Sequence, residues 1–414
     1  MSEIDSALNR AINFLTSPLC IDNSDTKGNG GFFGFQNTSK PLRKTDKPFI
    51  FYEITGYGIN LLLKLNHWYG DSKFVELAKK AGEAILLAQI KNKDSKVSGA
   101  IYDRFYPQED KFFETFHAYP NAVCAGALCE LYQQTKDKKY LDSARSIKDW
   151  LFQIIVKKNE SCIGFREFFD QNHVSEKIFP YESICIPFIL LKFKKELEIQ
   201  EKQKDELFQV IDWARKTQTG DGFFPFFFST QSGKFNNTAY PHFTIYPLYN
   251  LMGFPLSELE ELGCKDCFEP YLKCAEWMDR VQDENGGFFT YYFQNDHVWH
   301  QQSPAVGQAL CAFLHIYEKT NEKKFLDSAK KTATWLVTNQ IKEDKFAGSF
   351  YWIYPNKHYS TIQKKIMYAK ERISKRFDNS TKVTDLTILL DKIPIWPVQF
   401  AIEGLYRFKK IESS

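Results

Sequence analysis

Residues 51–65 read FYEITGYGINLLLKL and place a single acid, Glu53, directly ahead of a long apolar run. No other charged residue follows until Lys64. A helix with so little charge lacks a solvent-facing side and is typical of a helix packed between other helices. An acid at the start of such a helix is costly to bury unless it has a partner or a chemical task. The stretch therefore predicts a buried helix with a carboxyl group at its entrance.

The stretch that leads into this helix is one of six similar copies along the chain. Each copy ends an amphipathic stretch in Phe, Leu or Trp, continues in most copies with a Gln, and then reaches a Gly closely followed by aromatic residues. Successive anchor residues lie 72, 64, 63, 64 and 58 positions apart, which indicates a repeat architecture. The anchors are Phe14, Leu86, Trp150, Trp213, Trp277 and Trp335, and the glycines are Gly30, Gly99, Gly164, Gly222, Gly286 and Gly348.

Two kinds of helix alternate within the repeat. The helices after the Gly-aromatic turns lack a strong charged face, which indicates burial on most sides. These helices cover 54–65, 121–132, 182–193, 243–252, 303–317 and 398–408. The alternate helices, such as 73–89, 139–153 and 324–340, carry one charged face. The sequence therefore predicts an all-α fold, a single (α/α)6 barrel over 1–414 in which an outer ring surrounds an inner ring. Short β or irregular segments are expected in the long loops.

The repeat resembles those of known families. The pattern of Trp-Leu, a Gln and then Gly-Gly-Phe looks like the QW-type repeats of terpene cyclases and protein prenyltransferases. The sixfold count and the period of about 60 residues resemble six-hairpin glycosidases, polysaccharide lyases and uronate epimerases. The second resemblance implies a substrate cleft where the long loops enter the inner helices. Fold alone does not give function, so the side chains at that end must be considered separately.

Charge and composition narrow the function classes. Lys plus Arg number 54 against 51 Asp plus Glu, so the overall field gives no reason to expect a nucleic-acid partner. The N-terminus lacks the pattern of a signal peptide, and no run is long and apolar enough to span a membrane, so a cytoplasmic location is expected. Only Cys264 and Cys267 among nine cysteines have a metal-like spacing, and no second pair or nearby His completes a site. The sequence predicts no metal and no cofactor, and it leaves the oligomeric state open.

Glycosidic-bond cleavage by hydrolysis requires two carboxyl groups, one protonated and one ionised. Glu53 and Glu182 form the best pair in sequence, because each follows a Tyr and begins an apolar inner helix. Tyr57 lies one helical turn after Glu53 and is expected to hydrogen-bond the carboxyl group or a substrate. Glu114 and Glu403 are alternatives. The competing interpretation is that each acid caps its helix or interacts with the helix dipole.

A lyase or a C5-epimerase would instead use a base that removes a proton next to a carboxylate. His117 with Tyr119, and Tyr240 with His242, are candidate pairs, and Arg104 or Arg166 would neutralise a uronate. A structural role for these histidines and tyrosines is the alternative. The sequence does not separate hydrolase, lyase and epimerase.

The loops that enter the inner helices are rich in side chains that bind sugars by stacking or by directional hydrogen bonds. The predicted substrate-binding residues are Tyr52, Tyr119, Tyr181, Tyr240, His300, Gln301, Trp396, Gln399 and Arg104. An oligosaccharide or glycoconjugate is the expected substrate.

Two further possibilities stay open. The aromatic repeat is compatible with isoprenoid binding or cyclisation, although the acid and diphosphate motifs of those enzymes are missing. The second possibility is a non-catalytic glycan-binding protein. In addition, a basic helical segment at about 353–393 interrupts the sixth repeat and is expected to be a solvated face, a lid or a contact for an anionic partner. The leading hypothesis is an enzyme that cleaves glycosidic bonds through carboxylates at the barrel mouth.

Overall fold

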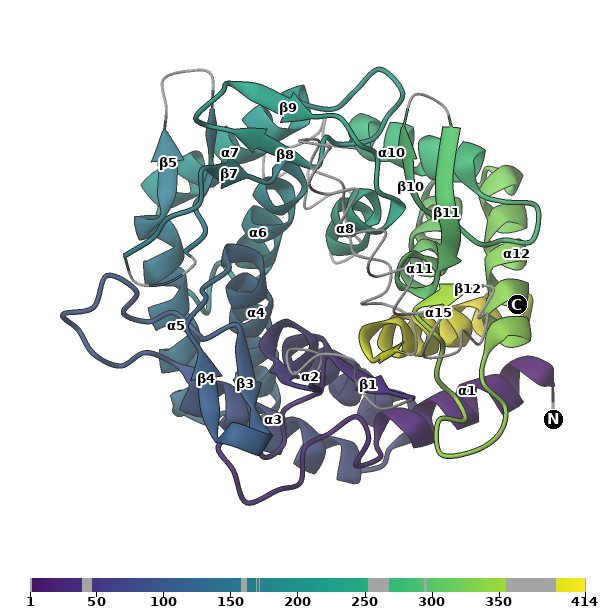
Figure 1. Ribbon diagram of the computed structural model, residues 1–414, viewed down its shortest axis with the longest axis horizontal. Helices are drawn as coiled ribbons and strands as arrows, with labels where there is room; N and C mark the ends of the chain where they lie inside the picture. Colours follow the sequence, from purple (N-terminus) through teal and green to yellow (C-terminus); the bar gives the residue numbers. More distant parts are fainter. Residues whose placement is uncertain are drawn as a thin grey trace, which may run out of the picture.

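The computed structural model describes residues 2–38, 47–157, 162–168, 170, 172–251, 268–293, 296–354 and 392–413, and only the backbone of 293 and 296–299. Twelve α-helices lie in these parts of the chain and form two concentric rings (Figure 1). The inner helices are α2 (Tyr52–Tyr69), α4 (Ala118–Thr135), α6 (Pro180–Lys192), α8 (Pro241–Leu251), α11 (Ser303–Thr320) and α15 (Trp396–Glu412). The outer helices are α1 (Glu3–Leu15), α3 (Lys73–Ala88), α5 (Lys138–Gln153), α7 (Glu201–Lys216), α10 (Phe268–Val281) and α12 (Lys323–Asn339). The predicted (α/α)6 barrel is confirmed.

The inner ring is closed. Each inner helix contacts the next one in chain order, from α2 through α4, α6, α8 and α11 to α15, and α15 contacts α2 again. All six inner helices begin at a long loop, so their N-termini lie at one end of the barrel, called here the mouth. Their C-termini lie at the opposite end, called here the floor.

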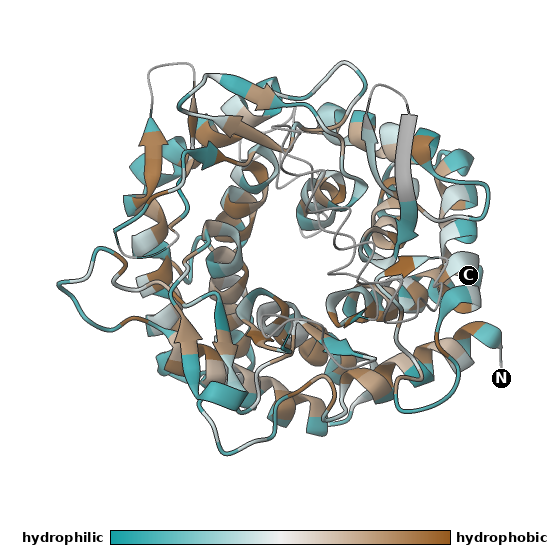
Figure 2. Ribbon diagram, in the orientation of Figure 1, coloured by the Kyte–Doolittle hydropathy of each residue, from teal (hydrophilic) through white to brown (hydrophobic). Residues whose placement is uncertain are grey.

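The apolar character predicted for the inner helices corresponds to burial between the rings. Residues Ser303–Ile316 of α11 are all buried, and one hydrophobic core runs from Ala7 to Phe408. Figure 2 shows brown, hydrophobic stretches along α4 and α6, whereas the peripheral loops are mostly teal. Burial of apolar surface on both sides of the inner ring is the main stabilising contribution to such a fold.

The repeat has a physical cause in the glycine of each copy. Gly30, Gly99, Gly222, Gly286 and Gly348 all have a positive φ, between 88° and 103°. A Cβ atom on Gly99 would lie 2.4 Å from the Ser146 carbonyl oxygen of α5, and the others meet the backbone of an outer helix in the same way. Only glycine permits both this conformation and this close approach. The third copy differs, because Gly164 meets the Ile178 side chain instead.

The repeat Gln also has a structural role. Gln89 donates to the Gly99 carbonyl oxygen at 2.9 Å and to the Ser143 carbonyl oxygen of α5 at 3.1 Å. Gln218, Gln282 and Gln340 likewise bridge their own Gly and the next outer helix. Each side chain thus satisfies two carbonyl groups and ties one repeat to the next.

Short strands tie the six long loops together around the mouth. The strands are β1 (Phe35–Asn37), β2 (Ile50–Phe51), β3 (Arg104–Tyr106), β4 (Lys111–Phe113), β5 (Ile155–Lys157), β6 (Ile163–Phe165), β7 (Lys177–Ile178), β8 (Phe227–Ser229), β9 (Lys234–Asn236), β10 (Phe289–Phe293), β11 (Asp296–Gln302), β12 (Ile353–Tyr354) and β13 (Lys392–Pro394). Antiparallel pairs β2–β3, β7–β8, β11–β12 and β13–β1 join neighbouring loops. Single bridges, Phe116 to Phe168 and Ala239 to Tyr292, join the remaining neighbours. The mouth is therefore surrounded by a continuous ring of backbone contacts.

Some of the sequence-based expectations concern residues that the structure does not describe. The basic segment at 353–393 is described only at its two ends, in β12 and β13, and Cys264 and Cys267 also lie outside the described residues. Within the described helices, none combines the length and hydropathy needed to cross a lipid bilayer.

Gly348 offers a test of the ring closure, because a Cβ atom there would lie 2.1 Å from the Arg10 carbonyl oxygen of α1. We expect Gly348→Ala to lower the free energy of unfolding by more than about 2 kcal/mol, since it adds a clash to the strain of a positive φ. Gly70→Ala is the matched control, because Gly70 has a φ of 68° but no atom within 4 Å of the added Cβ. That control should cost only about 1 kcal/mol. Equal losses in urea unfolding would show that the close approach is unimportant.

Candidate active site

The candidate site lies at the mouth, where the first turns of α2, α4, α6, α8 and α15 converge. Helix N-termini carry a partial positive charge and unpaired N–H groups, which favours negative charge at this end. Titratable side chains from several of these helices contact one another here, so their protonation states are coupled.

Glu53 lies in the first turn of α2 and is partly exposed. The Tyr246 hydroxyl of α8 donates to Glu53 Oε1 at 3.2 Å, which is a contact across the lumen because α8 lies opposite α2 in the ring. Burial and the nearby charge of Asp103 raise the pKa of Glu53 to about 8, although hydrogen bonds from Tyr246 and Tyr57 partly oppose this. Glu53 is therefore held as a protonated acid at neutral pH.

Asp103, which the sequence interpretation missed, is the charged neighbour of Glu53. It is 1% exposed and accepts a hydrogen bond from Arg104 Nε at 2.7 Å. Arg104, predicted to bind substrate, also packs over the ring of Phe49 at 4.7 Å. Arg104 is thus already engaged with Asp103 and with an aromatic ring of the β2–β3–β4 region.

A second cluster surrounds His117, which immediately precedes α4. His117 Nδ1 lies 2.5 Å from Glu167 Oε2. Burial alone would lower the pKa of His117, but the charges of Glu167 and Asp103 raise it to about 10. His117 is therefore an imidazolium group paired with a carboxylate.

Glu182 in the first turn of α6 belongs to the same cluster. Tyr181 donates to Glu182 Oε1 at 2.8 Å, and burial together with the charge of Glu167 raises the pKa of Glu182 well above its ordinary range. Glu53 and Glu182, predicted as an acid and an ionised partner, thus share the same tendency to stay protonated.

His242 in the first turn of α8 has the opposite character from His117. Burial lowers the pKa of His242 to about 4, so this ring is neutral at neutral pH. Its Nε2 lies 3.4 Å from the Tyr246 hydroxyl, which therefore stands between His242 and Glu53. The ring of Trp396 lies 6.1 Å from His242 and packs perpendicular to Trp352 at 4.8 Å.

Other predicted residues contribute to the walls. Tyr57 and Tyr119 are buried, and their hydroxyl groups lie 2.5 Å apart. Tyr52 and Tyr240 are also buried, and Tyr240 packs on Phe226 at 4.9 Å.

Two predicted sugar-binding glutamines connect helices instead. Gln301 in β11 accepts from Trp335 Nε1 at 2.9 Å and donates to Asp283 at 2.6 Å. Gln399 donates to the Ile54 carbonyl oxygen at 3.0 Å and so joins α15 to α2. His300 lies beside Gln301 in β11, where its carbonyl oxygen accepts from Thr290 at 2.9 Å.

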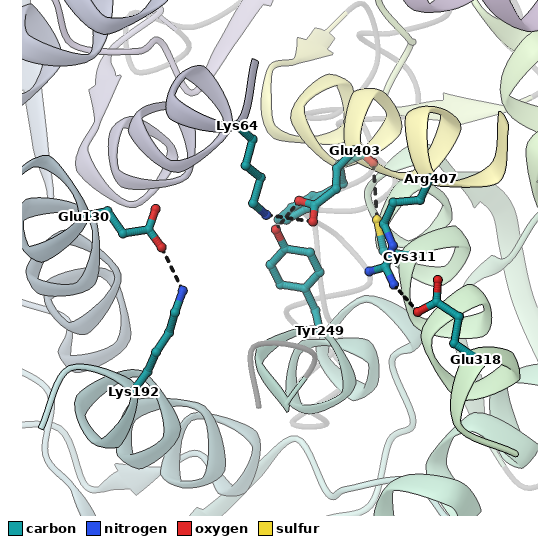
Figure 3. A network of polar contacts seen from close by, with 9 residues as sticks. Lys64, Glu130, Lys192, Tyr249, Cys311, Glu318, Glu403 and Arg407 are labelled. Carbon is teal, nitrogen blue, oxygen red and sulfur yellow. Dashed lines mark hydrogen bonds and ion pairs between the residues drawn. The ribbon is translucent and has the colours of Figure 1, made fainter. Parts of the chain in front are cut away.

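The two alternative acids, Glu114 and Glu403, and Arg166 lie outside this cluster. Glu114 and Arg166 are exposed. Glu403 lies at the floor, where it accepts from Lys64 Nζ at 2.7 Å and from the Tyr249 hydroxyl at 2.8 Å (Figure 3). Burial alone would raise the pKa of Glu403, but Lys64 and Tyr249 hold it below its ordinary value.

Asp103, Glu167 and Tyr246 were missed by the sequence interpretation. Asp103 follows Gly99 by four positions and Glu167 follows Gly164 by three, and each acid has an Arg as a chain neighbour. The offsets differ by one and the order of acid and Arg is reversed, so the signal in the sequence is only an acid beside an Arg within five residues of the repeat glycine. Tyr246 lies one helical turn after His242, on the same helix face.

Among the described side chains, no group of three or more His, Cys, Asp or Glu residues is arranged to hold a metal ion. The residues at the mouth offer proton transfer by Glu53, His117 and His242, combined with aromatic stacking at Trp396.

No protein-family model matches this chain, and no curated protein sequence matches it significantly. Several solved structures are similar to this chain in fold. Cellobiose 2-epimerase from Bacillus thermoamylovorans B4167 is 15% identical over 97% of this chain and 100% of its own, with a TM-score of 0.68. A GH76 α-mannanase of Bacteroides thetaiotaomicron is 12% identical over 99% and 97%, with a TM-score of 0.63. Unsaturated glucuronyl hydrolase from Bacillus sp. GL1 is 15% identical over 99% and 96%, with a TM-score of 0.63. These likenesses confirm the six-hairpin fold.

The raised pKa of Glu53 has a consequence for stability. The folded state retains the Glu53 proton up to about pH 8, whereas the unfolded chain loses it near the ordinary value of 4.5. Stability from this group is therefore complete below pH 4.5 and is lost as the pH rises to 8. In denaturant unfolding, Glu53→Gln should become progressively more stable than wild type across this window, by up to about 1.4 kcal/mol per pH unit. If the stabilities of wild type and Glu53→Gln change with pH in the same way, Glu53 ionises near its ordinary pKa.

Proposed function

We propose that this chain is a carbohydrate-processing enzyme in which Glu53 protonates a sugar oxygen, and that the leading reaction is hydrolysis of a glycosidic bond. The observation that carries the proposal is the partly exposed Glu53 at the mouth, with a pKa raised to about 8. A general acid must hold its proton at the working pH and release it to the leaving group. Glu53 meets the first condition and lies where a substrate can reach it.

The base that activates water is assigned to His242. Glu182 is a poor base because burial and Glu167 favour its protonated form. His242 is neutral and therefore free to accept a proton. Glu53 gives its proton to the leaving oxygen while water attacks the anomeric carbon and passes a proton to His242. The Tyr246 hydroxyl, 3.2 Å from Glu53 and 3.4 Å from His242, provides the route by which that proton returns to Glu53.

Several features of the mouth support a sugar substrate. Trp396, Trp352 and Phe243 are partly exposed beside His242, and aromatic faces stack on the apolar faces of pyranose rings. The imidazolium of His117 supplies a positive charge, which would favour a uronate-containing chain. The similar structures include enzymes named for cellobiose, mannan and unsaturated glucuronyl substrates.

Epimerisation at a carbon next to a carbonyl group is the second candidate. The chain of contacts from His242 through Tyr246 to Glu53 favours it, because one group can remove a proton from carbon while another returns a proton. The product keeps the mass of the substrate in that reaction, and the configuration of one carbon changes.

Activity is tested by incubating the protein with neutral and uronate-containing oligosaccharides and separating the products. Glu53→Gln should lower turnover by about 10²–10⁴-fold, since the amide has no proton to donate. Glu114→Gln is the matched control, because Glu114 is an exposed acid away from the cluster, and it should keep wild-type turnover. Full activity in Glu53→Gln would contradict the assignment of the general acid.

The two candidate reactions differ in their isotope labels. Hydrolysis in heavy-oxygen water should give new reducing ends that carry the label, with no deuterium at carbon when deuterium oxide is used. Epimerisation should give a product of unchanged chain length with deuterium at one carbon. A new double bond, detected by ultraviolet absorbance, would indicate a lyase instead, and stabilisation only by polyprenyl phosphates would favour isoprenoid binding.

A further inference from the structure

A second cavity lies at the floor, at the end of the barrel opposite the candidate active site. This floor cavity measures about 270 Å³ and is lined by side chains from five inner helices, α2, α4, α6, α8 and α15. Lys64, one of its lining residues, follows Glu53 by eleven positions on α2. At about 1.5 Å per residue, the two side chains start about 16 Å apart along the helix axis. The floor cavity is therefore not part of the mouth.

Tyrosine and asparagine side chains separate the two compartments. Tyr57 and Asn250 both line the floor cavity. Each contacts the Tyr119 hydroxyl, Tyr57 at 2.5 Å and Asn250 Nδ2 at 3.0 Å. The Tyr246 hydroxyl donates to Glu53 at the mouth, and the Tyr246 carbonyl oxygen accepts a hydrogen bond from Asn250 Nδ2 at 2.9 Å. A hydrogen-bonded layer thus crosses the lumen between mouth and floor.

The charged groups around the floor are paired with one another (Figure 3). The pairs are Lys64 with Glu403 at 2.7 Å, Lys192 with Glu130 at 2.8 Å, and Arg407 with Glu318 at 2.7 Å. Three cations and two of the carboxylates line the cavity, and Glu318, which lies outside the lining, neutralises Arg407, so every charge at the floor has an opposite partner. A charged ligand would have to displace one member of a pair, and leaving the buried Glu403 carboxylate without Lys64 is costly.

Uncharged hydrogen-bonding groups remain available in the cavity. Asn60 and Tyr249 line the cavity and are partly exposed. The ammonium groups of Lys64 and Lys192 each carry three donors, of which the ion pairs use only part. Tyr249 adds a partly exposed aromatic side chain to the same wall, whereas Phe188 and Phe193 are 0% and 3% exposed. Donors, acceptors and aromatic faces in one small space suit a molecule with many hydroxyl groups.

We propose that the floor cavity is a second binding site, which takes a small uncharged polyhydroxylated molecule of monosaccharide size. Sites for drug-sized ligands measure about 300–1,000 Å³, so a cavity of 270 Å³ suits a smaller ligand. Hydroxyl groups of the ligand hydrogen-bond to the Asn60 amide and accept from Lys64 and Lys192, while Tyr249 packs on its apolar face. The site does not rest on the chemistry at the mouth.

The test is calorimetric titration of the full chain with D-glucose, D-mannose, D-galactose and myo-inositol, beside glucuronate and glucosamine as charged probes. Asn60→Leu removes the amide from the cavity wall, and Ile189→Trp fills the cavity from α6. Asn66→Leu is the matched control, since it makes the same change on α2 outside the lining. Trp396→Ala weakens sugar binding at the mouth and so separates the two sites.

We expect at least one neutral probe to bind wild type and Trp396→Ala with the same affinity. Asn60→Leu and Ile189→Trp should weaken that binding by about tenfold or more, and Asn66→Leu should leave it unchanged. Three results would overturn the proposal. They are no neutral binding at tens of millimolar concentration, loss of binding in Trp396→Ala alone, and a preference for the charged probes. Loss of turnover in Glu53→Gln is independent of all three outcomes.

Discussion

In five of the six repeats, the close approach of a glycine to the backbone of the next outer helix is the constraint on which the barrel depends. Gly286 makes this contact with α12, and Gly348 makes it with α1, so the same interaction that joins neighbouring repeats also closes the ring. In four repeats a Gln adds hydrogen bonds to two carbonyl groups at the junction, as Gln340 does to Ala7 and Gly348. Because the outer ring is fixed in this way, the positions of the inner helices are constrained. The mouth is thereby preorganised before any substrate binds.

Within that rigid frame, α8 determines how the lumen is divided. Tyr246 crosses to Glu53 at the mouth, whereas Tyr249 crosses to Glu403 at the floor. Helix α8 is preceded by the mouth loops, so successive turns of this one helix serve different compartments. The two glutamates consequently have opposite protonation tendencies. Glu53 lacks a cation and lies near Asp103, while Glu403 has Lys64 beside it.

The ring and its closure could be predicted from sequence because they depend on spacing and local chemistry. An anchor side chain and a glycine recur at a regular period in six copies, and most copies add a glutamine, so the same junction can be identified six times. The convergence of Glu53, His117, Glu182 and His242 at one end followed from the order of helices and loops. The protonation states of these residues could not be predicted, because they depend on contacts between distant segments. His117 and His242 look alike in sequence, yet Glu167 makes one an imidazolium and burial makes the other neutral. The Glu53 to Tyr246 contact joins residues 193 positions apart, and no local pattern encodes it.

The polar layer across the lumen also bears on the class of ligand. A long isoprenoid chain needs a continuous apolar channel, since each unsatisfied polar group facing it would be desolvated without compensation. Here the hydroxyl groups of Tyr57 and Tyr119 and the amide of Asn250 cross the lumen below Glu53. Such a layer limits the depth of the mouth and gives it a polar base. A ligand that ends in hydroxyl groups can hydrogen-bond to that base, whereas a hydrocarbon chain cannot. We therefore expect this layer to favour a saccharide over a lipid, in agreement with the proposed function.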